Sequence, residues 1–137
     1  VVLPDRIDDG LVAWLTALPW PVTVVIHANH ANEFDASVDA ALSRLRHAGV
    51  HLLNQAVLLR GVNDDVDALA ALSERGFSAG VLPYYLHQLD RVAGAAHFEV
   101  DDARAMALHA ALAARLSGYL VPRLVREVAG DTGKRPL

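Results

Sequence analysis

The sequence of 137 residues contains no cysteine. This absence excludes a disulfide framework, and it also excludes a thiolate-ligated metal or iron–sulfur cluster within this stretch. The sequence has no apolar run of about 20 residues, which a membrane-spanning helix needs. It also has no excess of basic residues, since its formal net charge is -4 at pH 7, so a nucleic-acid-binding surface is not expected. We therefore expect a cytoplasmic protein that binds neither membranes nor nucleic acids.

Hydrophobic residues make up 53% of the chain, which is enough for one domain with a buried core. Helical periodicity alternates with β-branched runs. The predicted helices run from Asp5 to Leu18, from a cap at Asp35 to Gly49, from about Asn63 to Gly76, and from Asp101 or Asp102 to Leu116. The predicted strands are Val22–Ile26, Val50–Leu59 and Gly80–Leu86, followed by an edge or irregular strand over Tyr119–Val128. This alternation predicts an α/β fold with parallel strands, as half of a barrel or of an open sheet.

Polar residues lie in or after each predicted strand, near the end where ligands bind in parallel α/β proteins. His27 and His30 follow the first strand, where they could bind a metal or a ligand, or be satisfied by backbone groups. Gln55 lies inside the second strand, and a buried amide needs a partner on a neighbouring strand or on a ligand. Asp90 follows the third strand and could bind a cationic group or cap a turn. We therefore predict one shared site at this edge of the sheet.

Two basic residues also have more than one interpretation. Arg60, which precedes Gly61, could hold a carboxylate or phosphate bidentately, or pair with Asp64 or Asp65. Lys134 lies in a glycine-rich segment and could form a Schiff base, although a solvated terminal lysine fits the same pattern. These residues alone predict a site but no reaction.

Three segments together resemble the lysine 2,3-aminomutase family of radical S-adenosylmethionine enzymes. They are VIHANH at 25–30, LNQAVLLRGVND at 53–64 and PYYLHQLD at 83–90. The tail, residues 118–137, is similar to the C-terminal PLP-lysine segment of that family. The segment 82–98 is most similar to the bacterial branch that makes (R)-β-lysine for elongation factor P.

The resemblance implies a partial radical-SAM β/α barrel with a C-terminal PLP-lysine segment. In this family S-adenosylmethionine is cleaved on a [4Fe–4S] cluster, and the resulting radical takes hydrogen from a lysine held by PLP, whose amino group moves from the α- to the β-carbon. By resemblance, Lys134 carries PLP, and Asp90 and Glu127 bind the side-chain ammonium of the substrate. Glu127 replaces an aspartate of the free-lysine enzymes. His27 and Gln55 match positions near S-adenosylmethionine.

The chain departs from the family in lacking the CxxxCxxC motif that binds the cluster. It also begins with Val1-Val2-Leu3-Pro4, so we expect a C-terminal fragment that is inactive alone. We divide it into residues 1–100, the last βα units of the barrel, and residues 101–137, the final helix and the PLP-lysine tail. Expected partners are lysine, elongation factor P with its ligase, and a second copy in a homo-oligomer.

Three alternatives stay open at this point. The protein could be a free-lysine 2,3-aminomutase of general metabolism. It could be a non-radical barrel enzyme that uses Lys134 as a Schiff base or His27 and His30 as metal ligands. It could also be a half-barrel with a structural or interaction role.

Overall fold

A computed structural model describes residues 4–90, 94–127, 130 and 133–137, and it contains one five-stranded sheet in the order β1-β2-β3-β4-β5. The strands are β1 (Thr23–His27), β2 (His51–Leu58), β3 (Leu82–Gln88), β4 (Arg123–Arg126) and β5 (Arg135–Pro136). The first four strands are parallel neighbours, and β5 pairs with β4 in the antiparallel sense. The predicted α/β fold with parallel strands is confirmed.

The helices are α1 (Asp9–Thr16), α2 (Ala36–His47), α3 (Val66–Ser78) and α4 (Asp102–Arg115). Each begins at an aspartate whose side chain accepts a hydrogen bond from a backbone N–H three residues later; these caps are Asp8, Asp35, Asp65 and Asp101. Such a cap satisfies one of the free N–H groups that every helix start leaves. None of the helices in the described part of the chain combines the length and apolar composition that crossing a membrane requires.

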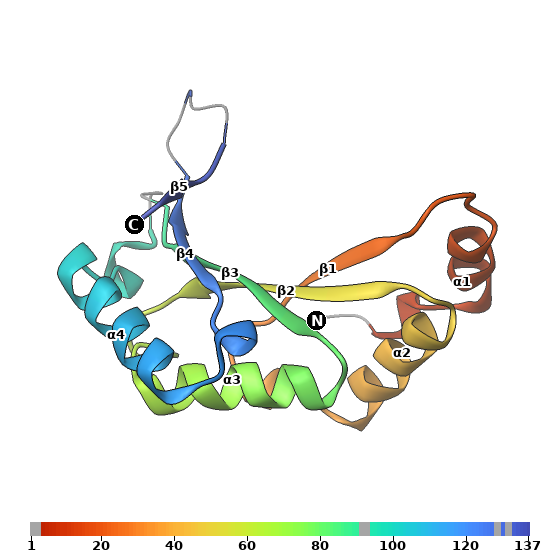
Figure 1. Cartoon of the computed structure of the whole chain (residues 1–137), viewed down its shortest axis with the longest axis horizontal. Coiled ribbons are helices and arrows are strands. Elements are labelled where there is room, and N and C mark those ends of the chain that lie inside the picture. Colours follow the sequence, from red (N-terminus) through yellow and green to blue (C-terminus); the bar gives the residue numbers. More distant parts are fainter. Residues whose placement is uncertain (1–3, 91–93, 128–129, 131–132) are drawn as a thin grey trace.

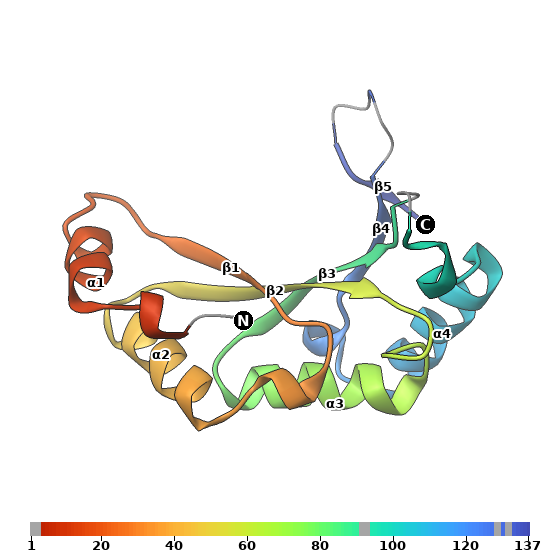
Figure 2. The same cartoon turned by 180° about the vertical axis from the view of Figure 1, so that it is seen from behind.

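Helices α2, α3 and α4 all lie on one side of the sheet, as Figure 1 and the opposite view in Figure 2 show. The core fills the space between them and includes Leu45, Leu58, Leu86 and Leu112, all nearly inaccessible to solvent. In the described residues no helix covers the other face of the sheet, which we call the open face. The strands therefore have one buried face and one accessible face, and the accessible face is where a ligand can reach the sheet.

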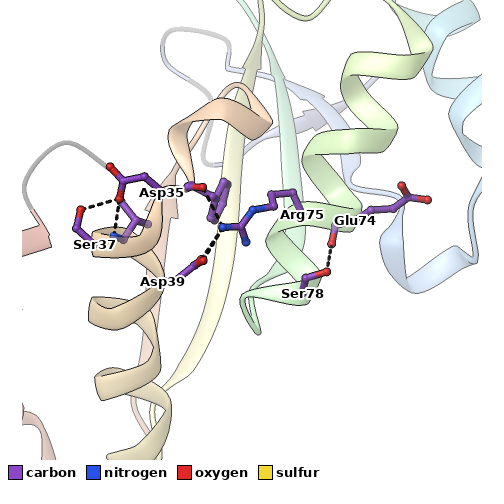
Figure 3. Close-up of polar contacts among 8 residues, drawn as sticks. Asp35, Ser37, Asp39, Glu74, Arg75 and Ser78 are labelled. Carbon is purple, nitrogen blue, oxygen red and sulfur yellow. Dashed lines mark hydrogen bonds and ion pairs between the residues drawn. The ribbon is translucent and has the colours of Figure 1, made fainter.

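An ion pair ties α2 to α3 on the helical side (Figure 3). Nη2 of Arg75 lies 2.7 and 2.8 Å from the two carboxylate oxygens of Asp39, and it also donates to the carbonyl oxygen of Phe34 at 2.9 Å. The guanidinium carbon lies 5.3 Å from the centre of the Phe34 ring. One cation thus joins the start of α2, the loop before it and the last turn of α3.

Several predicted boundaries were wrong. Helix α3 does not end at Gly76 but continues to Ser78. The chain turns at Gly80, which has φ of +82°, and the Val81 N–H donates to the Gly76 carbonyl. This bond is part of the Schellman motif that ends many helices. Helix α1 starts later than predicted, after its cap at Asp8.

The last two strands also differ from the prediction. Strand β4 is shorter than the predicted extended segment and begins after Pro122, which has no N–H to donate. It is not an edge strand, because β3 and β5 flank it. The short strand β5 was missed altogether. The part of the predicted strand at residue 128 lies outside the described residues.

Candidate functional site

The carboxyl ends of β1 and β2 are fixed by two buried asparagines. Asn54 Oδ1 accepts from the Ala28 N–H at 2.9 Å, and Asn54 Nδ2 donates to the Ala28 carbonyl at 3.0 Å. Asn63 is fully buried. Its Nδ2 donates to the Asn29 and Val57 carbonyls at 2.8 and 2.9 Å, and its Oδ1 accepts from Leu59 N–H at 2.7 Å. The motif at 53–64 therefore builds the edge of the site by satisfying its backbone groups.

The strand register brings the predicted side chains onto the open face. His27 is paired with Gln55, and Gln55 is paired with Tyr85. Because side chains alternate along a strand, His87 lies on the same face as Tyr85. Gln55 is half-buried there and His27 is exposed. One row of polar side chains thus crosses β1, β2 and β3.

Lys134 reaches this row from the β4–β5 hairpin. Val125 pairs with Pro136 and Arg126 with Arg135, so continuing the antiparallel register by one residue sets Lys134 opposite Glu127. Their side chains form an ion pair, with Nζ 3.3 Å from Oε1 of the carboxylate. Cross-strand partners of opposite charge stabilise such a pairing. The neighbouring Arg126 binds Asp102 of α4 through its two terminal guanidinium nitrogens, which anchors the end of β4.

The amine of Lys134 contacts three side chains. Besides Glu127, Nζ lies 3.0 Å from Nε2 of His87 and 4.7 Å from the centre of the Tyr85 ring. The other imidazole nitrogen of His87, Nδ1, lies 4.0 Å from Oε1 of Glu127. The Lys134 side chain is 27% exposed and that of His87 is 13% exposed. We call Tyr85, His87, Glu127 and Lys134 the lysine cluster.

The pKa of His87 lies below its usual value of 6.5, mainly because burial penalises the charged ring and then because the Lys134 ammonium repels it. Glu127 and Asp90 act in the opposite direction and raise this pKa, whereas His27 lowers it. His87 is therefore neutral at pH 7 and can accept a proton or a hydrogen bond from Lys134.

The structure brings most of the predicted site residues together. Lys134, Glu127, Asp90 and His27 all act on the charge of His87, and Gln55 adjoins His27 in the sheet. Asp90 itself is exposed. These side chains thus lie near one another at the carboxyl edge of the sheet.

The alternative left open for His30 resolves to a structural role. His30 caps a short 3-10 helix, with Nδ1 accepting from the Asn32 N–H at 3.2 Å, which is the backbone-satisfied interpretation. Asp64 accepts from the Gly61 N–H, and Asp65 caps α3. In the described residues, no group of three or more histidine or acidic side chains could hold a metal ion.

No individual role was predicted for His87 or Tyr85. The third strand was predicted to end at Leu86, but β3 extends to Gln88 and includes His87. A signal was present, because Tyr85 and His87 are two residues apart, as side chains on one face of a strand must be. The predicted strand, Gly80–Leu86, lies two residues before β3, so His87 fell outside it and this spacing was not recognised.

Comparisons with known proteins add to this geometry. The chain is 50% identical over its whole length to "L-lysine 2,3-aminomutase" of Escherichia coli (strain K12), covering 40% of that protein. It is 47% identical over 98% of its length to the protein of the same name from Haemophilus influenzae, again covering 40%. It is 39% identical to that of Clostridium subterminale over its full length, covering 33%. No family model matches the chain.

Among solved structures, a radical SAM methyltransferase from Sphaerobacter thermophilus has a similar fold. The TM-score is 0.62 at 16% identity, over 85% of this chain and 37% of that one. The sheet, its one-sided helices and this likeness define the class as a partial radical-SAM β/α barrel.

Within that class, the resemblance to the lysine 2,3-aminomutase family is confirmed, since the chain is similar along its whole length to proteins of that name. The chain spans about 40% of the length of the Escherichia coli and Haemophilus influenzae relatives.

Proposed function

We propose that the full-length protein is a PLP-dependent radical S-adenosylmethionine enzyme that converts L-lysine to β-lysine. The observation that carries this proposal is the lysine cluster: a half-buried amine held at the carboxyl edge of a radical-SAM-type sheet, between a carboxylate and a neutral imidazole. The relatives named L-lysine 2,3-aminomutase support the choice of reaction.

We assign the attachment of PLP to Lys134. The fit rests on its surroundings, since Nζ is partly shielded from solvent, lies over the Tyr85 ring and has His87 as a neighbour that is neutral at pH 7. A lysine that attacks a carbonyl must do so as an uncharged amine. When bound, PLP stabilises charge or an unpaired electron next to the amino group that moves.

We assign the side-chain ammonium of the substrate to Asp90 and Glu127. Glu127 already holds an alkylammonium in this structure, because its Oε1 lies 3.3 Å from Nζ of Lys134. Asp90 is close enough to raise the pKa of His87, so both carboxylates contribute negative charge to one region. A desolvated ammonium needs such partners, since burying an unpaired charge is costly.

We assign His27 and Gln55 to the S-adenosylmethionine side of the site, because they occupy neighbouring positions at the end of β1 and in β2. The [4Fe–4S] cluster needs thiolate ligands, and this chain has no cysteine. We therefore assign the cluster ligands to a part of the full-length protein outside these residues. We also propose a cytoplasmic location, and the division of this chain at residue 100.

We further propose that the product serves elongation factor P. The observation in favour is Glu127, one methylene longer than the aspartate of the free-lysine enzymes, together with the sequence of the segment 82–98. The test is to give the enzyme's product to the ligase that modifies elongation factor P. Acceptance supports this branch, and refusal leaves the free-lysine enzyme of general metabolism.

Substrate selection tests the main proposal. The full-length enzyme, reconstituted anaerobically with iron, sulfide, PLP and S-adenosylmethionine, should form a β-amino acid from L-lysine but not from L-norleucine, which lacks the side-chain ammonium. Asp90→Asn and Glu127→Gln should raise KM for lysine about 10-fold or more, since hydrogen bonds to charged groups are worth about 1.5–3 kcal/mol. Asp67→Asn is the matched control, because Asp67 pairs with Arg115 on the helical side. Equal use of norleucine would contradict the assignment.

A further inference from the structure

We infer that His87 is the proton acceptor for Lys134: its Nε2 takes a proton from the lysine ammonium and so frees the amine to attack the carbonyl of an aldehyde cofactor. The inference rests on the proposed role of Lys134 and adds a residue to that site. It starts from one distance, the 3.0 Å between Nζ of Lys134 and Nε2 of His87. That separation is a hydrogen bond, the range within which a general base must lie.

The protonation states make the transfer possible in this direction. Burial and the Lys134 charge both lower the pKa of His87, so at pH 7 the ring is neutral and its unprotonated nitrogen can face the ammonium. The other ring nitrogen, Nδ1, lies 4.0 Å from Glu127, and a proton on Nδ1 faces that carboxylate. This tautomer leaves Nε2 free to accept.

The surrounding charges also stabilise the product of the transfer. When the proton moves, Lys134 becomes a neutral amine and His87 becomes an imidazolium, so the total charge is unchanged. The repulsion from Lys134 then disappears, while Glu127 and Asp90 remain to favour the charged ring, opposed by His27. These four groups, from the ends of β1, β3, β4 and β5, are those that act on His87 electrostatically. The transfer therefore leaves the charged ring near two carboxylates that favour it.

A purely structural alternative makes a different prediction. If His87 only held Lys134 in place as a hydrogen-bond acceptor, glutamine would replace it, because its carbonyl oxygen also accepts but takes up no proton at this pH. His87→Gln therefore separates a proton acceptor from a positioning contact. His51→Gln is the matched control, since His51 is exposed at the opposite end of β2.

The experiment follows the capture of PLP by the full-length enzyme after its own PLP has been removed. PLP is added between pH 5.5 and 9, the adduct is fixed with borohydride, and the modified Lys134 peptide is quantified by mass spectrometry over time. The wild-type rate should fall as the pH drops through a value below 6.5, where His87 becomes protonated. His87→Gln should be about 100-fold slower at pH 7, the typical contribution of a general base, without that inflection. Imidazole added to His87→Ala should restore part of the rate.

Each outcome decides a separate point. Wild-type rates and an unchanged pH profile in His87→Gln would overturn the role of His87 while leaving Lys134 as the attachment site. Equal losses in His51→Gln would also overturn it, since they would show a general defect. The absence of an adduct on Lys134 in the wild-type enzyme would instead remove the proposed function itself, and this inference with it.

Discussion

Replacing Asn63 with alanine should loosen the carboxyl edge of the sheet without touching the lysine cluster. The side chain is fully buried and makes three hydrogen bonds, all to backbone groups at the ends of β1 and β2. A neutral hydrogen bond contributes about 1 kcal/mol net, so the loss should be about 3 kcal/mol.

Native-state hydrogen exchange of the full-length enzyme measures this loss locally. Peptides that cover β1 and β2 should exchange about 150-fold faster in Asn63→Ala, because each 1.4 kcal/mol is a factor of ten. Asn32→Ala is the matched control, since Asn32 is exposed and surface changes alter stability by about 0.5 kcal/mol or less. Unchanged exchange in Asn63→Ala, or an equal increase in the control, would refute the reasoning.

Three further predictions concern stability. Because the pKa of His87 is lowered in the folded protein, the unfolded chain binds more protons than the folded one as the pH falls below 6.5, and stability is lost toward acid. His87→Gln should reduce this loss in thermal melts recorded from pH 7 to 5. An identical dependence of stability on pH in the variant would contradict this prediction. Gly80→Ala and Gly49→Ala should each lower the free energy of unfolding by about 1 kcal/mol, because both glycines have positive φ. At position 80 the new methyl group would meet the side chain of Arg46, which is flexible and can move. Urea midpoints test this, and an unchanged midpoint in either variant would contradict the assignment of these glycines to helix ends. Arg75→Met should lower the free energy of unfolding by about 1 kcal/mol, since its ion pair with Asp39 is partly exposed. The urea midpoint of the double variant, which adds Asp39→Asn, should fall little further. Additive losses would show that the two side chains do not act as a pair.

The sequence predicted the fold class because the periodicities of its elements are unambiguous. In the predicted helix after Asp35, the apolar residues Val38, Ala41, Leu42 and Leu45 recur at helical spacing, and all four are buried in α2. The cap at Asp35 was predicted as well, because aspartate is a favoured residue at a helix start. Where several aspartates precede a helix, as before α1, the sequence did not show which one is the cap, and it is Asp8 rather than Asp5. Gly76 was misread as a helix end, since glycine inside a helix is disfavoured and only the positive φ of Gly80 showed where the chain turns.

The site was only partly predictable, because it depends on register. Lys134, Glu127 and Asp90 came from the family resemblance, whereas the hydrogen bond between Lys134 and His87 depends on β5, a strand of two residues that no periodicity reveals. The roles of Asn54 and Asn63 were also hidden, because the backbone groups that they satisfy lie up to 34 residues away in the chain. Sequence patterns indicate which residues are unusual, but the strand pairing decides which of them meet.

We propose above all that Lys134 holds PLP in a full-length enzyme that converts L-lysine to β-lysine. The most direct measurement is chiral product analysis of L-lysine incubated anaerobically with the reconstituted full-length enzyme and with its Lys134→Ala variant. The account predicts β-lysine from the wild-type enzyme and none from the variant, which should also lose the absorbance of protein-bound PLP. Formation of 5′-deoxyadenosine without any β-lysine, or full activity in Lys134→Ala, would contradict it.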